Sequence, residues 1–183
     1  MSKRIVRNIF ENASDKNIAL TSESQSRLSY KDLKLFIDKI SKQLAGNGLS
    51  NKDRAAIVLP NGPYIASSFL AISSYMSAAP LNPSYKSEEY EFYLKDLNPK
   101  IVLVEKNSEN PVVDVAKKLK IELCEINPEK DGPSGIFNIY EKESEYSLPN
   151  ESDEALVLHT SGTTSRPKIV PLTNKNIFSS AEN

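Results

Sequence analysis

Apolar residues in the first half of the chain switch between helical spacing and short unbroken runs. Two short strands are expected at about 17–21 and 27–29. A helix should follow them, because Ser29 and Asp32 have the spacing of a capping box. One face of that helix carries the apolar residues Leu33, Phe36, Ile37, Ile40 and Leu44. Residues 55–59 then form an unbroken apolar run, which is typical of a parallel strand buried on both faces.

The same alternation continues as far as residue 124. Further helices are expected over about 63–76, from a cap at Ser87 through Leu97, and over 111–119. Strands are expected at 78–81, 101–104 and 121–124. The crossover between two parallel strands must return over a face of the sheet. This order therefore predicts an α/β fold with a mostly parallel sheet and βαβ crossovers.

The segment 127–154 breaks this alternation. It is rich in proline and glycine and holds eight acidic but only two basic residues, so it is expected to be a solvated acidic loop. The apolar run 155–158 after it predicts another buried strand. Near the end of the chain, Asn174 is placed to cap a helix whose Ile177 and Phe178 need a partner surface.

A hydroxyl-rich stretch that ends in a lysine follows the strand at 155–158. Gly162 allows close approach of the backbone to a ligand, and Pro167 fixes the chain just before Lys168. Hydroxyls, backbone amides and an ammonium group together suit the oxygens of a nucleotide polyphosphate. The pattern is not a Walker A loop, since Lys168 follows a proline and precedes an isoleucine. The candidate phosphate-binding residues are Thr160, Ser161, Gly162, Thr163, Thr164, Ser165 and Lys168.

The order of residues from Thr160 to Lys168 resembles the phosphate loop of the adenylate-forming superfamily. This superfamily includes acyl-CoA synthetases, luciferases and the adenylation domains of peptide synthetases. Two positions depart from its pattern, because Ser165 and Ile169 stand where glycine is usual. Further stretches, at 54–62, 79–85, 88–90 and 94–97, are similar to acyl-CoA synthetases in the same order. Among these enzymes the chain looks closest to the oxalate–CoA ligase branch.

The resemblance implies an AMP-forming ligase that uses ATP, magnesium and coenzyme A to activate a small-molecule carboxylate. Lys168 is then the expected catalytic residue, acting on the β- and γ-phosphates as pyrophosphate leaves. Residues 1–183 are expected to be part of the large N-terminal domain, with the C-terminal domain absent. The adenine pocket, the magnesium ligand and the acyl pocket would all lie outside this chain, so no metal ligand is assigned and the fragment alone is expected to be inactive.

Several alternatives stay open on these residues. The carboxylate could be oxalate, a fatty acid or a hydroxycinnamate, and luciferases or peptide-synthetase adenylation domains share the loop but not the acceptor. A non-catalytic truncated module is the alternative from another class. His159 is the single histidine and has no companion cysteines or histidines in the sequence around it, so a structural role is favoured over a catalytic one.

Composition narrows the class of partner. With 23 basic and 24 acidic residues the net charge is −1, which gives no reason to expect a nucleic-acid partner. No membrane span is expected, and Cys124 in an apolar run suggests a reduced, buried thiol. A cytoplasmic location is therefore expected, while a peroxisomal one would require a C-terminal targeting signal. The oligomeric state is left open.

Overall fold

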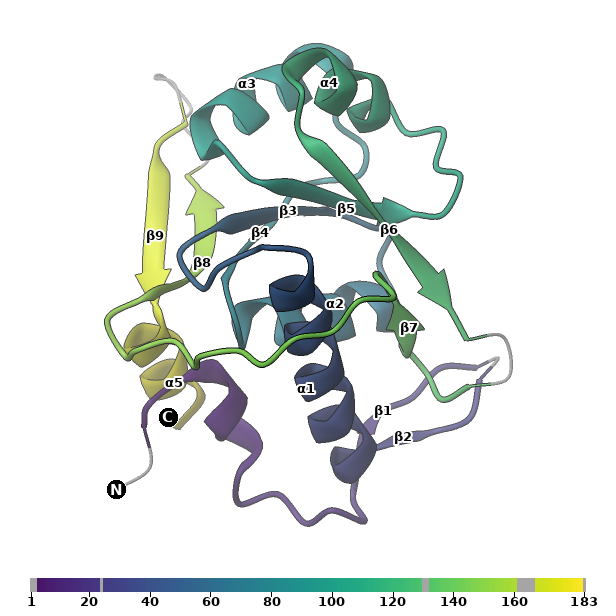
Figure 1. The fold of residues 1–183 in the computed structure, drawn as a ribbon, viewed down its shortest axis with the longest axis vertical. Helices are drawn as coiled ribbons and strands as arrows, with labels where there is room; N and C mark the ends of the chain where they lie inside the picture. The colour runs from purple at the N-terminus through teal and green to yellow at the C-terminus, as the bar shows by residue number, and fades with distance from the viewer. Residues whose placement is uncertain (1–2, 24, 130–131, 161–166, 183) are drawn as a thin grey trace.

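The computed structural model describes residues 3–23, 25–129, 132–160 and 167–182. A seven-stranded sheet forms the centre of the molecule, with the strand order β7-β6-β5-β3-β4-β8-β9 (Figure 1). Its parallel strands are β3 (Arg54–Val58), β4 (Ser77–Pro80), β5 (Ile101–Glu105), β6 (Glu122–Pro128) and β8 (Glu154–His159). Antiparallel strands occupy both edges, β7 (Phe137–Asn138) beside β6 and β9 (Ile169–Thr173) beside β8. The expected mostly parallel α/β fold is confirmed.

Helices cover both faces of the sheet. Figure 1 shows α1 (Tyr30–Gly46) and α2 (Pro63–Ser73) on one face, and α3 (Ser87–Leu97) and α4 (Val112–Leu119) on the other. Alternate residues of each central strand enter different cores. Ala55 and Ile57 pack with α1 and α2, whereas Ala56 and Val58 pack with α3 and α4. Burial on both faces explains the unbroken apolar runs in the sequence.

Helix α1 begins where its sequence predicts and buries the predicted face. The Ser29 hydroxyl accepts a hydrogen bond from the Asp32 amide at 3.2 Å and donates one to the Asp32 carboxylate at 2.6 Å. All five apolar residues of the expected stripe are at most 4% exposed. The short strands before the helix are present as β1 (Ile18–Leu20) and β2 (Leu28–Ser29), which pair antiparallel in a separate sheet.

Two predicted helix caps are wrong by one residue. The cap of α3 is Lys86 and not Ser87, because the Lys86 amide donates to Glu89 Oε2 at 2.9 Å. The cap of α5 (Asn174–Glu182) is Thr173 and not Asn174. Thr173 Oγ1 accepts from the Asn176 amide at 3.2 Å, while Asn176 Oδ1 accepts from the Thr173 amide at 2.9 Å. Asn174 is buried instead, because its side chain bonds elsewhere in the fold.

The segment 127–154 is not simply a solvated loop. Its acidic residues 141, 143 and 145 are exposed as expected. However, Phe137 is 1% exposed and its ring meets Phe36 edge-on, with 4.9 Å between the ring centroids. The Tyr146 hydroxyl also donates a 2.7 Å hydrogen bond to Asp38 Oδ1, so the segment contacts α1 at a second point. The apolar residues around Phe137 lie in the short stretch 136–140, which is too short to set a clear period, so the sequence pattern missed it.

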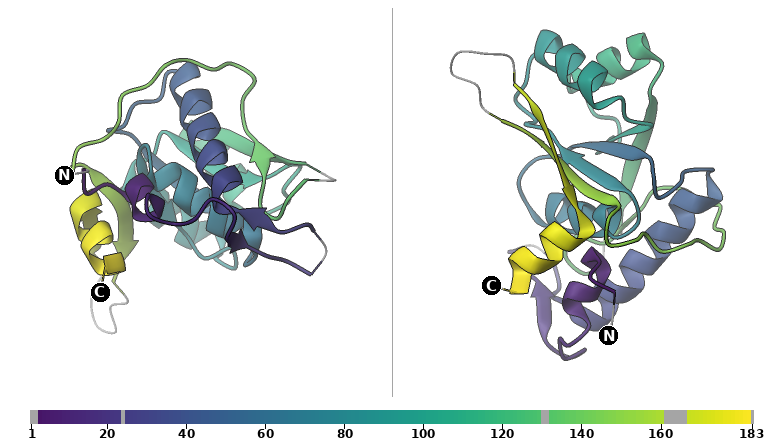
Figure 2. Two further views of the ribbon diagram at one scale, coloured as in Figure 1. Left: turned by 90° about the horizontal axis from the view of Figure 1, so that it is seen from below. Right: turned by 90° about the vertical axis from the view of Figure 1, so that its left-hand side faces the viewer.

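The last helix lies against the start of the chain. A short 3-10 helix, η1 (Val6–Phe10), packs beside α5, as Figure 2 shows from two sides. The Val6 amide donates to Asn174 Oδ1 at 3.0 Å. Ile177 and Phe178 are half-buried, so the partner surface that the sequence requires is provided by the chain itself.

Candidate functional site

Strands β8 and β9 form a hairpin whose tip holds the candidate phosphate-binding stretch. β8 runs parallel to β4, so the hairpin leaves the sheet at the carboxyl ends of the parallel strands, where α/β proteins bind ligands. His159 pairs with Ile169 as the last step of the antiparallel ladder. One residue further on, Thr160 and Lys168 face each other. The hairpin therefore positions both described ends of the stretch.

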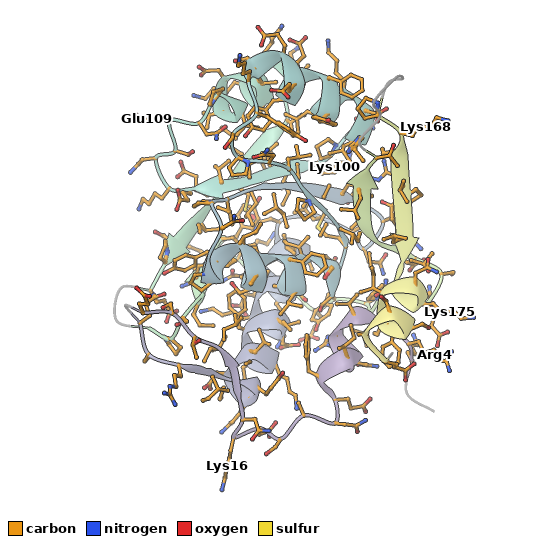
Figure 3. All side chains as sticks on the ribbon, turned by 180° about the vertical axis from the view of Figure 1, so that it is seen from behind. Arg4, Lys16, Lys100, Glu109, Lys168 and Lys175 are labelled. Carbon is orange, nitrogen blue, oxygen red and sulfur yellow. The ribbon has the colours of Figure 1, made fainter. Side chains whose placement is uncertain are left out.

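Two hydrogen bonds join the ends of that stretch. The Thr160 amide donates to the Lys168 carbonyl at 3.0 Å, and the Lys168 amide donates to Thr160 Oγ1 at 3.1 Å. Lys168 is exposed and stands directly before the first residue of β9 (Figure 3). Of the seven candidate residues the structure thus brings Thr160 and Lys168 together, whereas Ser161, Gly162, Thr163, Thr164 and Ser165 lie outside the described residues.

The donor set at this hairpin fits an anion. An exposed ammonium and a threonine hydroxyl beside an exposed backbone suit phosphate oxygens. Within the described ranges, no group of three or more histidine, cysteine, aspartate or glutamate residues could hold a metal ion. Residues for the expected magnesium are therefore not found in the part of the chain that the structure describes.

An aromatic cluster supports the end of β8. His159 Nε2 lies 3.0 Å from Asp96 Oδ2, and the imidazole meets the Tyr93 ring edge-on, with 4.7 Å between centroids. Tyr93 in turn stacks on Tyr85 at 4.9 Å. Burial raises the pKa of Tyr85 to about 12, so this phenol stays neutral and acts by packing. Asp96 lies in the stretch 94–97 that resembles acyl-CoA synthetases, but the sequence could not indicate its contact with His159, 63 residues further on.

A polar cavity of about 410 Å³ lies at the amino ends of the parallel strands, opposite the end that carries Lys168. Its lining includes Lys52, Arg54, Ser77 and Glu154, which stand at the amino ends of the parallel strands. Arg54 holds Glu154 in a two-point ion pair, with nitrogen–oxygen distances of 2.7 and 2.9 Å. Because Lys168 is at the carboxyl ends, this cavity is separate from the candidate phosphate site.

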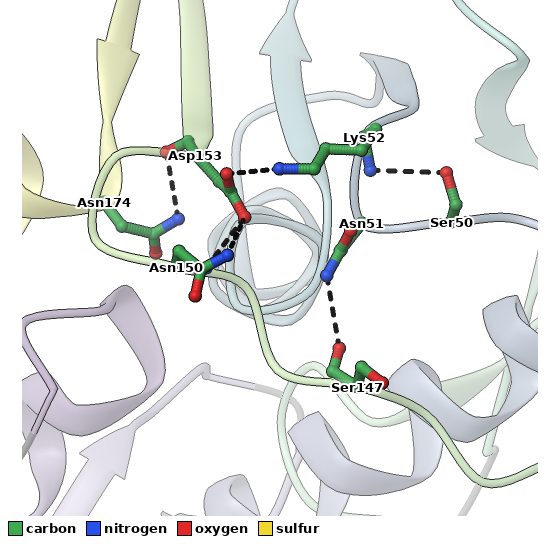
Figure 4. Close-up of polar contacts among 7 residues, drawn as sticks. All are labelled: Ser50, Asn51, Lys52, Ser147, Asn150, Asp153 and Asn174. Atoms are coloured by element: carbon green, nitrogen blue, oxygen red, sulfur yellow. Dashed lines mark hydrogen bonds and ion pairs between the residues drawn. The ribbon is translucent and has the colours of Figure 1, made fainter.

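Beside that cavity, Asp153 connects three parts of the chain (Figure 4). Its carboxylate pairs with the Lys52 ammonium and accepts from the Asn150 amide at 2.8 Å. Its carbonyl accepts from the Asn174 amide at 2.9 Å and from Asn174 Nδ2 at 3.2 Å. Burial opposes the charge of Asp153, but the bonds from Asn150 and Lys52 outweigh it and hold its pKa below the ordinary value. This network closes the base of the β8–β9 hairpin.

The structure also addresses two other expectations from the sequence. Cys124 is 1% exposed, and burial raises the pKa of its thiol to about 12, as expected for a small packed side chain. Among the described residues, no helix combines the length and the apolar character that crossing a membrane requires.

Proteins similar to this chain in sequence include two oxalate–CoA ligases. The chain is 36% identical over 172 residues to an oxalate–CoA ligase of Arabidopsis thaliana, a match that covers 90% of this chain and 34% of that protein. It is 30% identical over 203 residues to an oxalate–CoA ligase of Saccharomyces cerevisiae, covering 93% of this chain and 37% of the other. The chain therefore spans about a third of the length of these curated relatives.

Solved structures show the same fold. Apo MatB from Rhodopseudomonas palustris superposes with a TM-score of 0.78 at 22% identity, over 98% of this chain and 36% of that protein. The family model for AMP-binding enzymes matches residues 9–183, almost the whole chain. We conclude that this chain belongs to the family of AMP-binding enzymes.

Proposed function

We propose that this chain supplies the phosphate-binding part of an ATP-dependent carboxylate–CoA ligase. The observation that carries the proposal is the β8–β9 hairpin, which presents Thr160 and Lys168 at the carboxyl ends of the parallel strands. In such a ligase a carboxylate attacks the α-phosphate of ATP and pyrophosphate leaves. The thiol of coenzyme A then captures the acyl-adenylate and releases AMP.

Lys168 is the proposed catalytic residue of this chain. Negative charge grows on the bridging oxygen as pyrophosphate departs, and a positioned ammonium stabilises that charge more in the transition state than in the ground state. The β8–β9 ladder ends at Ile169, next to Lys168, and the lysine is exposed, which supports this role. Thr160, Ser161, Thr163, Thr164 and Ser165 are proposed to donate hydroxyl hydrogen bonds to the phosphates, with Gly162 allowing close approach.

Replacement of Lys168 tests this proposal in the complete ligase that carries these residues. Lys168→Ala should slow carboxylate-dependent pyrophosphate release by roughly 10- to 1000-fold, because it removes the stabilising charge while leaving the ladder intact. Lys175→Ala is the matched control, since Lys175 is also exposed but lies on α5 (Figure 3). Pyrophosphate release that is equal in the two variants would exclude Lys168 from the reaction.

Oxalate is the proposed carboxylate. The support is the resemblance to two proteins named oxalate–CoA ligase at 36% and 30% identity. A small dicarboxylate needs a compact polar pocket, whereas a fatty acid needs a long apolar channel, and one pocket cannot serve both well. A CoA-dependent assay should show oxalate activated far better than octanoate or coumarate. Preference for either competitor would overturn the substrate and leave the ligase proposal standing.

The use of magnesium and coenzyme A is part of the same proposal. Magnesium would neutralise charge on the polyphosphate when bound. A cytoplasmic location stays a prediction. The pyrophosphate assay also distinguishes the ligase from a non-catalytic module, because a module would release no pyrophosphate with any carboxylate.

A further inference from the structure

We propose that His159 is a positioning residue, which fixes the direction of Lys168 through a bond to Asp96 and a ring contact with Tyr93. These three residues are called the His159 brace. The proposal deepens the ligase function and rests on it for its kinetic consequences. Its structural consequence, the order of the Lys168 backbone, can be measured without any activity.

The first step is how firmly His159 is held. Its side chain is only 8% exposed, although it lies at the last pair of the β8–β9 ladder, next to exposed Thr160. Nε2 is 3.0 Å from Asp96 Oδ2. The ring meets Tyr93 at an interplanar angle of 68°, with centroids 4.7 Å apart. A hydrogen bond and a ring contact together leave the imidazole a single orientation.

The second step is that the partners of His159 are themselves fixed. Tyr93 stacks on Tyr85 with centroids 4.9 Å apart, and Tyr85 meets the Tyr90 ring edge-on at 5.8 Å. Tyr90 is fully buried and donates to the Asn82 carbonyl at 3.0 Å. Leu94 and Leu97 anchor the same helix in the core with no exposed surface. The brace therefore ties the end of β8 to a rigid part of α3.

The third step leads from His159 to Lys168. Thr160 follows His159 directly, and two hydrogen bonds join Thr160 to the backbone of Lys168. Among the described strands, β9 is at the edge of the sheet and has β8 as its only neighbour. The path of β9 near Lys168 consequently depends on the path of β8, and at this end the brace holds β8.

The last step separates positioning from general stability. Asp96 is 42% exposed, and hydrogen bonds to such exposed carboxylates contribute little to global stability. A displacement of a catalytic group by about 1 Å can nevertheless cost on the order of a hundredfold in rate. Loss of the brace is therefore expected to affect turnover far more than folding.

The test compares His159→Phe with two variants of Asp96 and one control variant, all in the complete protein. His159→Phe keeps an aromatic ring for Tyr93 but loses the bond to Asp96. Asp96→Ala removes the same bond from the other side and also serves if His159→Phe fails to fold. Asp96→Asn keeps an acceptor oxygen and is the conservative rescue. Tyr140→Phe is the control, because it removes a 2.6 Å bond to Glu122 near the other edge of the sheet.

Two measurements decide the outcome. Amide hydrogen exchange at Lys168 should accelerate at least about fivefold in His159→Phe and Asp96→Ala, and stay unchanged in Tyr140→Phe. In the pyrophosphate assay, His159→Phe and Asp96→Ala should lower kcat about tenfold while KM for ATP changes less than about threefold. Asp96→Asn should keep most of the kcat that Asp96→Ala loses. Unchanged exchange at Lys168, or unchanged kcat in an active enzyme, would overturn the positioning role. If the unmodified protein releases no pyrophosphate, the ligase proposal fails, and the exchange measurement still decides whether the brace orders Lys168.

Discussion

At the scale of single residues, Asp153 is a carboxylate that stays ionised although its side chain is buried. Its side chain is 7% exposed, and an isolated carboxylate there would be costly. The Asn150 amide and the Lys52 ammonium compensate, so the pKa of Asp153 lies below its ordinary value of 3.8. The Asp153 carbonyl also accepts hydrogen bonds from the backbone amide and the side-chain amide of Asn174. Asp153 therefore links the base of the hairpin to the start of α5.

Asp153→Asn should therefore destabilise the protein at pH 7 by about 1–3 kcal/mol, through loss of charge-assisted hydrogen bonds. A folded-state pKa below the unfolded value means that the charge stabilises the fold above pH 3.8 and that this advantage is lost as pH falls through the lowered pKa. Urea unfolding at pH 7 and near pH 3 should show the difference between the proteins shrinking in acid. Asp15→Asn is the control, because Asp15 is 61% exposed. A difference that grows in acid would contradict this account.

At the scale of elements, the segment 127–154 has the largest effect on the fold beyond the predicted helices and strands. It adds β7 to the edge of the sheet and inserts Phe137 between α1 and α2. Phe137 meets Phe36 at 4.9 Å and Tyr64 at 6.4 Å, measured between ring centroids. The segment thus completes one of the two cores although its composition is that of a loop.

Phe137→Ala should cost about 3–5 kcal/mol of stability, because it leaves a cavity among close-packed rings. Leu148→Ala in the same segment should cost less than about 0.5 kcal/mol, since Leu148 is 40% exposed. Chemical unfolding of both variants measures the contrast. Equal losses would mean that the segment does not contribute to the core through Phe137.

At the scale of the whole molecule, the described residues form a closed α/β unit whose candidate site faces outward. Lys168 is exposed, and the hairpin that carries it projects from the sheet (Figure 2). Small-molecule sites usually bury most of their ligand's surface. An exposed hairpin therefore has to be combined with other surfaces before it can enclose ATP and a carboxylate.

Residues 1–183 alone should consequently release no pyrophosphate with ATP, coenzyme A and oxalate, and should bind ATP only weakly. A coupled pyrophosphate assay and isothermal titration of the purified chain check this expectation, with a complete ligase as positive control. Carboxylate-dependent turnover by the 183 residues would show that the site is already complete within them.

The main elements followed from the sequence because their signals are local. Helix α1 depends on a hydroxyl, a carboxylate and five apolar positions within 17 residues, and the strands depend on short apolar runs. The cap of α3 was wrong by one residue for a local reason, the bond between Lys86 and Glu89, whereas the cap of α5 was decided by a distant residue. Asn174 looked like a cap, but its side chain bonds Val6, 168 residues away, and Thr173 caps the helix instead. The strand β9 forms by pairing with β8, and Phe137 is buried by packing on Phe36, so both depend on contacts that the local pattern does not show.

The candidate site also has one part that local sequence signals predict and one part that depends on the fold. The sequence by itself predicts the chemistry of the loop, since hydroxyls, a glycine and a lysine in that order suit phosphate oxygens. It also determined the α/β class, because periodicity is a property of neighbouring residues. Only the tertiary structure decided that Thr160 faces Lys168 and that Asp96 and Tyr93 hold His159. Asp96 lies 63 residues before His159, and the Thr160–Lys168 contact needs β8 and β9 to be paired, so this geometry exists only after the helices and the sheet have packed.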